Sequence, residues 1–124
     1  MSETTARQLL AILPLINRIL VADLRQEAGD NTTMPQFRVL AYLIERPLTL
    51  SEIARIRRVT LQSAGELVQA LVDRGWIMRV ADPHDRRQTL LHLTALGRQQ
   101  HERVNSRMIA HMTPIMERLT SEER

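Results

Sequence analysis

The sequence of 124 residues contains no cysteine and no lysine, and its only aromatic residues are Phe37, Tyr42 and Trp76. Without cysteine it has no disulfide, thiolate nucleophile or thiol-based redox sensor, and a reducing cytoplasm is its expected location. Without lysine it has no phosphate-loop or Schiff-base lysine, which excludes most nucleotide-dependent enzymes. So few aromatic rings also argue against a module that stacks the bases of single-stranded nucleic acid.

Long apolar runs are missing too. No run approaches the roughly 20 residues that a membrane-spanning helix needs. The first 30 residues carry scattered acidic and arginine side chains and no small-residue cleavage site. We therefore expect no membrane partner and no export.

Positive charge gathers in the middle of the chain, where every basic residue is an arginine. Residues 36–98 hold 10 arginines against 6 acidic residues, whereas residues 1–35 hold 3 against 4 and residues 99–124 hold 4 against 4. A basic centre between near-neutral, apolar ends suggests that the centre meets a polyanion and the ends meet protein. A chance bias on a solvated surface is the alternative.

Apolar residues recur at helical spacing in the first half of the chain. A first predicted helix reaches to Gly29, and Pro14 either kinks it or marks a second start. A second helix runs from about Pro35 to the residue before Pro47. The stripe of the first helix is wide: Leu9, Leu10, Ile12, Leu13, Ile16, Ile19 and Leu20.

Two shorter helices follow. Ser51 is expected to cap a third helix that ends at Arg57 and Arg58. A fourth begins near Thr60 and is closed by Gly75. One face of this helix is predicted to carry Leu61, Ala64, Leu67, Val68 and Leu71, of which the last four form its core face.

After Gly75 the pattern of apolar residues changes from helical spacing to one typical of extended strands. Trp76 to Val80 and Thr89 to Leu93 read as strands, joined by turn residues from Ala81 to Arg87, so a hairpin is predicted. Thr94 then caps a long helix, which Pro114 should bend or divide. Its apolar positions include Val104, Met108, Met112 and Met116.

This order of elements predicts a mainly α (α+β) fold, a winged helix-turn-helix with a dimerisation helix at each end. We expect one continuous structural domain, in which residues 1–32 form the N-terminal dimerisation helix. Residues 33–97 form the DNA-binding lobe and residues 98–124 the C-terminal dimerisation helix.

The fourth helix is the expected reader of the DNA major groove. Opposite its core face it presents Gln62, Ser63, Glu66 and Gln69, side chains that can pair with base edges, although a polar solvent-exposed face is the plainer explanation. Arg55, Arg57 and Arg58 cluster just before it, where their planar guanidinium groups suit phosphate oxygens. Thr60, at the start of the helix, joins this predicted DNA-binding set.

The hairpin tip carries adjacent arginines, Arg86 and Arg87, close to Asp85. Such a tip can enter a narrow minor groove, with the carboxylate orienting a guanidinium. By itself the signal is weak, because Asp-Pro turns with flanking arginines are common.

The run Asp85-Arg86-Arg87 after Asp82-Pro83, followed by Leu93-Thr94-Ala95-Leu96-Gly97, resembles the wing and wing exit of the MarR family of bacterial transcriptional regulators. The resemblance extends over about residues 33–97. It implies a dimeric repressor of palindromic operators that releases DNA when a small, often aromatic, ligand binds. It also implies that Arg87 enters the minor groove, that Asp85 holds it, and that Gln62, Ser63 and Glu66 lie on the recognition helix.

The sequence gives little support for thiol sensing, metal binding or catalysis. The family's peroxide-sensing branch needs a cysteine, which is absent. The four histidines, His84, His92, His101 and His111, include no i, i+4 pair, so no metal site is expected. Scattered acids and histidines offer no catalytic constellation, so we expect no enzyme and no cofactor beyond an effector of unknown identity.

The expected function is therefore sequence-specific binding of double-stranded DNA by a ligand-responsive homodimer. The rival is a winged-helix module that binds a protein partner, or DNA without sequence preference. A stripe of Met108, Met112 and Met116 is expected in the core or the dimer seam, with a wall of the ligand site as the alternative.

Overall fold

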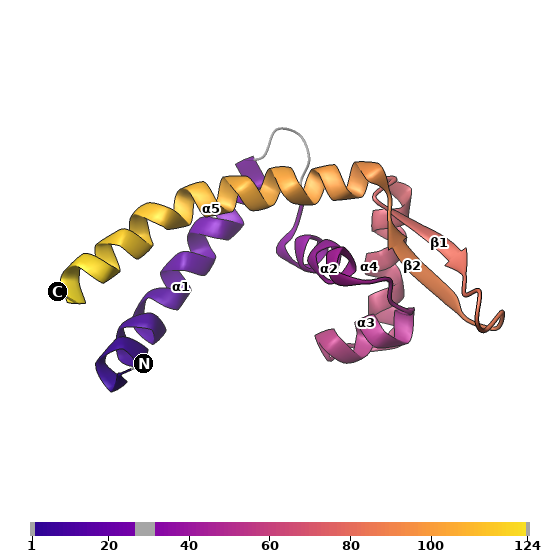
Figure 1. Ribbon diagram of the computed structural model, residues 1–124, viewed down its shortest axis with the longest axis horizontal. Coiled ribbons are helices and arrows are strands. Elements are labelled where there is room, and N and C mark those ends of the chain that lie inside the picture. Colours follow the sequence, from indigo (N-terminus) through magenta and orange to yellow (C-terminus); the bar gives the residue numbers. More distant parts are fainter. Residues whose placement is uncertain (1, 27–31, 124) are drawn as a thin grey trace. The chain divides into compact units, whose positions relative to one another are not determined.

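The computed structural model describes the backbone of residues 2–26 and 32–123 and the side chains of residues 2–18 and 32–118. Its elements are α1 (Glu3–Gln26), α2 (Met34–Glu45), α3 (Leu50–Arg57), α4 (Leu61–Asp73), β1 (Ile77–Ala81), β2 (Thr89–Leu93) and α5 (Ala95–Glu123) (Figure 1). The predicted mainly helical winged-helix fold is confirmed, in the predicted order. The expected end of the first helix at Gly29 lies outside the described residues.

The chain divides into two compact units. One, which we call the lobe, is Met34–Glu102; the other, the arm unit, combines Met1–Thr33 with Arg103–Arg124. The compact lobe thus runs five residues past Gly97, and the predicted division of the chain into domains stays a prediction. The reason is local: Gln100 is buried, and the ring of His101 stacks on Phe37 of α2 with centroids 5.0 Å apart.

The lobe is built around one apolar core. Leu71, Val68 and Ala64 of α4 are fully enclosed and Leu67 is partly buried, which confirms the predicted core face of this helix. Helical spacing places these residues on one side, so their burial follows from the sequence. The complete cluster is Val39, Leu40, Leu43, Leu48, Ile53, Ala54, Ala64, Val68, Leu71, Trp76, Ile77 and Leu91.

The hairpin pairs β1 with β2 in antiparallel register, from Ile77 opposite Leu93 to Ala81 opposite Thr89. Trp76, predicted as the first strand residue, precedes β1 and is buried. The segment before α3 adds an isolated bridge: Leu48 N–H donates to the Leu91 carbonyl at 3.3 Å, and Leu91 N–H donates to the Leu48 carbonyl at 2.7 Å. This bridge joins the wing to the start of α3.

Two glycines mark the ends of the wing. Gly75, with φ of 78°, terminates α4: its N–H donates to the Val72 carbonyl and the Trp76 N–H to the Leu71 carbonyl, a Schellman arrangement. Gly97 lies against Trp76, where a Cβ atom would stand 2.0 Å from the Trp76 carbonyl oxygen. Only glycine fits there, which explains the glycine at the wing exit.

Some predicted helix boundaries need correction. The N-cap of α3 is Thr49, not Ser51, because the Thr49 hydroxyl accepts the N–H of Glu52. Thr94 caps α5 as predicted, accepting the N–H of Gly97 at 3.0 Å. Neither proline divides its helix: α1 continues through Pro14, which marks no second start, and α5 continues through Pro114.

In the arm unit the described side chains are mostly exposed. Ile16 of α1 and Val104 and Met108 of α5 are buried. Several large apolar side chains are exposed instead: Leu10, Leu13, Leu15, Ile109 and Met116. Within the described part of the chain, no helix combines the length and apolar character needed to cross a bilayer.

Candidate nucleic-acid interface

The start of α3 is held by a capping box. Glu52 N–H donates to the Thr49 hydroxyl at 3.1 Å, and Thr49 N–H donates in return to Glu52 Oε1 at 3.0 Å. Arg46 Nη2 donates to the second carboxylate oxygen at 2.9 Å. The bond from the Thr49 backbone and then Arg46 lower the pKa of Glu52 below its ordinary value of 4.5. The carboxylate is thus ionised and engaged on both oxygens.

A tight turn joins α3 to α4. Arg58 adopts the left-handed conformation, with φ of 57° and ψ of 47°, which costs a non-glycine residue about 1 kcal/mol. The following Val59 N–H donates to the Ala54 carbonyl at 3.0 Å, so the last turn of α3 is closed. Thr60 then caps α4, accepting the N–H of Ser63 at 3.0 Å. These residues make a helix-turn-helix.

The predicted reading side chains lie at the start of α4. Gln62, Ser63 and Glu66 are all exposed, as their position opposite the buried face requires. Thr60 is exposed as well, but its hydroxyl serves as the cap. Their contact with bases stays a prediction.

Gln69 lies one helical turn further on, and its side chain already makes hydrogen bonds within the lobe. Its Nε2 donates to Asp73 Oδ1 and its Oε1 accepts from Arg79 Nη2, both at 2.8 Å. Arg79 stands on β1, so this chain of bonds ties the wing to the recognition helix. The sequence offered no signal for it, since Arg79 is simply one polar residue in a short strand.

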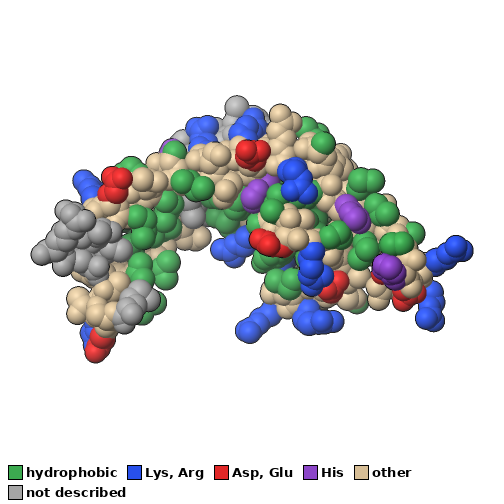
Figure 2. All heavy atoms as spheres, viewed as in Figure 1, with side chains coloured by type: hydrophobic (Ala, Val, Ile, Leu, Met, Phe, Trp, Pro, Cys, Tyr) green, Lys and Arg blue, Asp and Glu red, His purple; other side chains and the backbone are tan. Residues whose placement is uncertain are grey.

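The three arginines at the end of α3 differ in how far their side chains are exposed to solvent. Arg55 and Arg58 are exposed, whereas Arg57 is half-buried, and its Nε has no hydrogen-bond partner among the described residues. Figure 2 shows arginine side chains projecting along the edge of the lobe that carries α3 and at the far end of the hairpin. The predicted phosphate-facing cluster is thus open at two of its three positions.

The wing tip is ordered by two aspartates. Asp82 Oδ1 accepts the N–H of His84 at 2.9 Å, and Asp85 Oδ1 accepts the N–H of Arg87 at 3.1 Å. The side chain of Arg87 is 95% exposed, and its Nε lies 3.6 Å from Asp85 Oδ1. Asp85 therefore holds Arg87 mainly through the backbone and leaves the guanidinium projecting into solvent. Arg86 is exposed beside it.

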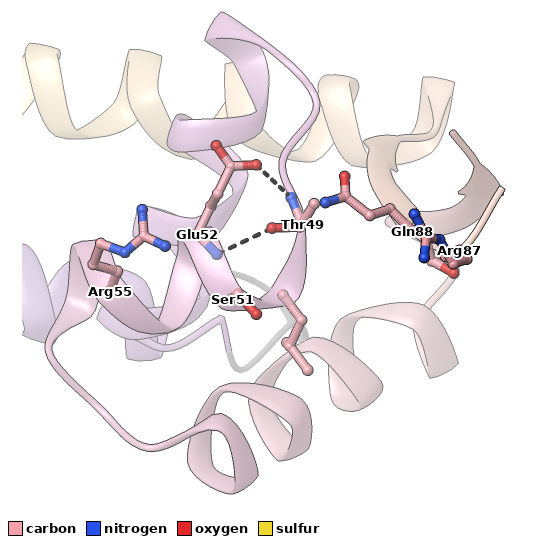
Figure 3. A pocket seen from close by; sticks show the side chains of 8 residues that line it. Thr49, Ser51, Glu52, Arg55, Arg87 and Gln88 are labelled. Carbon is pink, nitrogen blue, oxygen red and sulfur yellow. Dashed lines mark hydrogen bonds between the residues drawn. The ribbon is translucent and has the colours of Figure 1, made fainter. Parts of the chain in front are cut away.

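A cleft of about 420 Å³ separates the start of α3 from the wing. Arg55 of the first predicted group and Arg87 of the wing both line it, and Figure 3 shows them on its opposite sides. The remaining lining residues are Thr49, Leu50, Ser51, Glu52, Gln88 and Thr89, and of these none had been predicted as a site residue. All ten predicted site residues belong to the lobe.

Arg74 connects two further elements of the lobe. Its guanidinium carbon lies 3.8 Å from the centre of the Trp76 ring, and its Nη1 donates to Gln36 Oε1 of α2 at 3.2 Å. Burial lowers the pKa of Arg74 below its ordinary value. Arg74 thus links the end of α4 to α2.

Residues 30–88 match the sequence profile of the MarR family. The match covers just under half of the chain and points to the MarR family of regulators. MarR-family members are transcriptional regulators and not enzymes, and this chain has their winged-helix, DNA-binding fold. Among the described residues, no group of three histidine, aspartate or glutamate side chains is placed to hold a metal ion.

Solved structures agree with this assignment. RV1404 from Mycobacterium tuberculosis is 29% identical, with a TM-score of 0.79 over 94% of this chain and 79% of that one. YusO from Bacillus subtilis is 28% identical, with a TM-score of 0.75 over 95% and 82%. FabT from Streptococcus pneumoniae, solved in complex with DNA, is 25% identical, with a TM-score of 0.76 over 90% and 79%. No curated protein matches the sequence significantly.

Proposed function

We propose that this MarR-family chain is a ligand-responsive repressor that binds a palindromic operator as a homodimer. The observation that carries the proposal is the presence of two reading elements on one lobe. The start of α4 offers Gln62, Ser63 and Glu66 to solvent, and the wing presents Arg87 beside Asp85. The first set suits base edges in the major groove, and a projecting arginine suits a narrow minor groove.

The homodimer rests on the apolar surface of the arm unit. Leu10 is 68% exposed, and Leu13 and Leu15 are each about half exposed. A second copy of the arm unit would cover them, and a two-fold axis would place the two lobes for half-sites about one helical turn apart. The similarity to FabT, which was solved in complex with DNA, supports DNA as the partner.

A small, often aromatic, effector follows from the family resemblance alone. Its identity depends on the shape of the pocket that would bind it, and the expected cytoplasmic location stays a prediction.

The test is a fluorescence-anisotropy titration of DNA from upstream of the chain's own gene against a scrambled duplex, at two salt concentrations. A preference of about a thousandfold identifies a sequence-specific regulator. Equal, weak binding to both duplexes contradicts operator recognition by this site and favours the module without sequence preference.

Arg87→Ala should weaken operator binding by about 1–3 kcal/mol, because it removes a groove-inserted cation. The matched control is Arg7→Ala, which removes the same charge from an exposed arginine paired with Glu3 on α1. If Arg87→Ala binds as tightly as the control, the wing takes no part in recognition.

A further inference from the structure

The cleft between α3 and the wing is lined by hydrogen-bond donors that have no partner in the lobe. The side chains of Ser51, Arg55, Gln88 and Thr89 all face it, and none of them makes a hydrogen bond or ion pair with another described residue. In Figure 3 the Gln88 side chain extends from the wing toward α3. A hydroxyl, a guanidinium and a carboxamide can all donate, so the group they suit is rich in acceptor oxygens.

The acidic residue of the cleft does not oppose an anion strongly. Both carboxylate oxygens of Glu52 are engaged, one by the Thr49 N–H and the other by Arg46, with which it forms an ion pair at 2.9 Å. The negative charge of Asp85 is also paired, because its Oδ1 lies 3.6 Å from Arg87 Nε. Arg55 is left as a cation without an acidic partner among the described residues.

The two walls of the cleft are held in place before any ligand arrives. The reciprocal backbone bonds between Leu48 and Leu91 join the segment entering α3 to β2. The capping box at Thr49 fixes the first turn of α3. The donors are therefore carried on a preorganised frame, which reduces the ordering cost of binding.

The position of the cleft identifies its occupant, given the function proposed above. If α4 lies in a major groove and the wing enters the adjacent minor groove, the sugar-phosphate strand separating the two grooves must pass between them. The cleft lies between the helix-turn-helix and the wing. We propose that it holds one phosphodiester group of this strand, with Ser51, Arg55, Gln88 and Thr89 donating to its oxygens.

The first test compares two variants with matched controls. The variant Ser51→Ala/Gln88→Ala removes two of the three neutral donors, and the variant Arg55→Gln removes the charge. Controls are Ser106→Ala and Gln99→Ala, which alter exposed residues of α5. The double variant should bind operator and scrambled duplex about tenfold more weakly, with an unchanged ratio between them, because phosphate contacts carry no sequence information. Arg55→Gln should reduce the salt slope by about 0.9.

The second test locates the phosphate. Single methylphosphonate linkages, which lack the charge, are placed one at a time along the duplex. The linkage at one position between the α4 and wing footprints should weaken binding by the wild type about tenfold. It should weaken binding by the double variant by a clearly smaller factor, because only Arg55 and Thr89 still face the phosphate there. Melting temperatures of all variants should equal that of the wild type, which separates lost contact from lost folding.

Failure of this inference is distinguishable from failure of the proposed function. Suppose that each linkage weakens binding by the wild type and by the double variant by the same factor, while the operator is still preferred over the scrambled duplex. This result overturns the assignment of the cleft and leaves the proposed function intact. If one linkage weakens the wild type more than the double variant, but neither protein prefers the operator, the result supports a phosphate in the cleft and overturns operator recognition. If no linkage couples, but inorganic phosphate raises the melting temperature of the wild type and not of the double variant, the cleft binds a free anion and the DNA assignment is overturned.

Discussion

The lobe and the arm unit treat similar apolar side chains in opposite ways. Leu40 and Leu71 of the lobe are inaccessible to solvent, whereas Leu10 and Leu13 of α1 are more than half exposed. Burial of a leucine contributes about 1.5–3 kcal/mol, so the lobe gains more from Leu40 and Leu71 within one chain than the arm unit gains from Leu10 and Leu13. The lobe therefore has a core of its own, while Leu10 and Leu13 leave apolar surface exposed on the described part of α1.

The largest expected effect tests the lobe's core. Leu71→Ala should destabilise the lobe by about 2–5 kcal/mol, because it removes a fully enclosed side chain and leaves a cavity. Urea unfolding followed by the fluorescence of Trp76, the single tryptophan, measures this at several protein concentrations. A loss that vanishes at high concentration would mean that the lobe's core depends on dimerisation.

The same substitution in the arm unit should act on assembly instead. Leu10→Ala should weaken self-association about tenfold or more, since a two-fold interface loses the side chain twice. It should leave the urea midpoint reported by Trp76 nearly unchanged at high concentration. Sedimentation equilibrium gives the dissociation constant, with Leu96→Ala, an exposed leucine of the lobe, as the control. An unchanged dissociation constant would remove Leu10 from the dimer surface.

The smallest effect concerns His101, which belongs to the lobe because it stacks on Phe37. Burial, and then Arg98, lower its pKa below the ordinary value of 6.5, while Glu102 opposes them. The unfolded chain is then protonated first as the pH falls, so the contribution of His101 to stability is complete above pH 6.5 and declines below it. His101→Gln should make the urea midpoint less sensitive between pH 7.5 and 5.5, relative to His111→Gln. Equal sensitivity in both variants would show that the stack does not favour neutral His101.

Much of the lobe was predictable because its signals are local. The buried face of α4 follows from a 3.6-residue period, and Gly75 and Thr94 are end signals of familiar chemistry. The exposure of Gln62, Ser63 and Glu66 follows from the same period. The error at the start of α3 was also local: both Thr49 and Ser51 are good N-caps, and only Glu52 three residues after Thr49 distinguishes them through the capping box.

The extent of the lobe was less predictable. The sequence suggested an end at the wing exit, because the helical period of α5 begins there. The structure continues the lobe to Glu102, because Gln100 and His101 pack in it. A helix that passes from one unit into another keeps its period throughout, so periodicity cannot mark the boundary.

By itself the sequence determined the order of elements, the core face of the recognition helix and the turn between the two strands of the wing, because each depends on residues a few positions apart. Tertiary structure alone decided that Gln69 is bound by Arg79, that Leu48 bridges to Leu91, and that Ser51 and Gln88 line one cleft. The physical reason is that donors from distant segments come together only when the core fixes the distance between their backbones, and no local pattern of side chains encodes that distance.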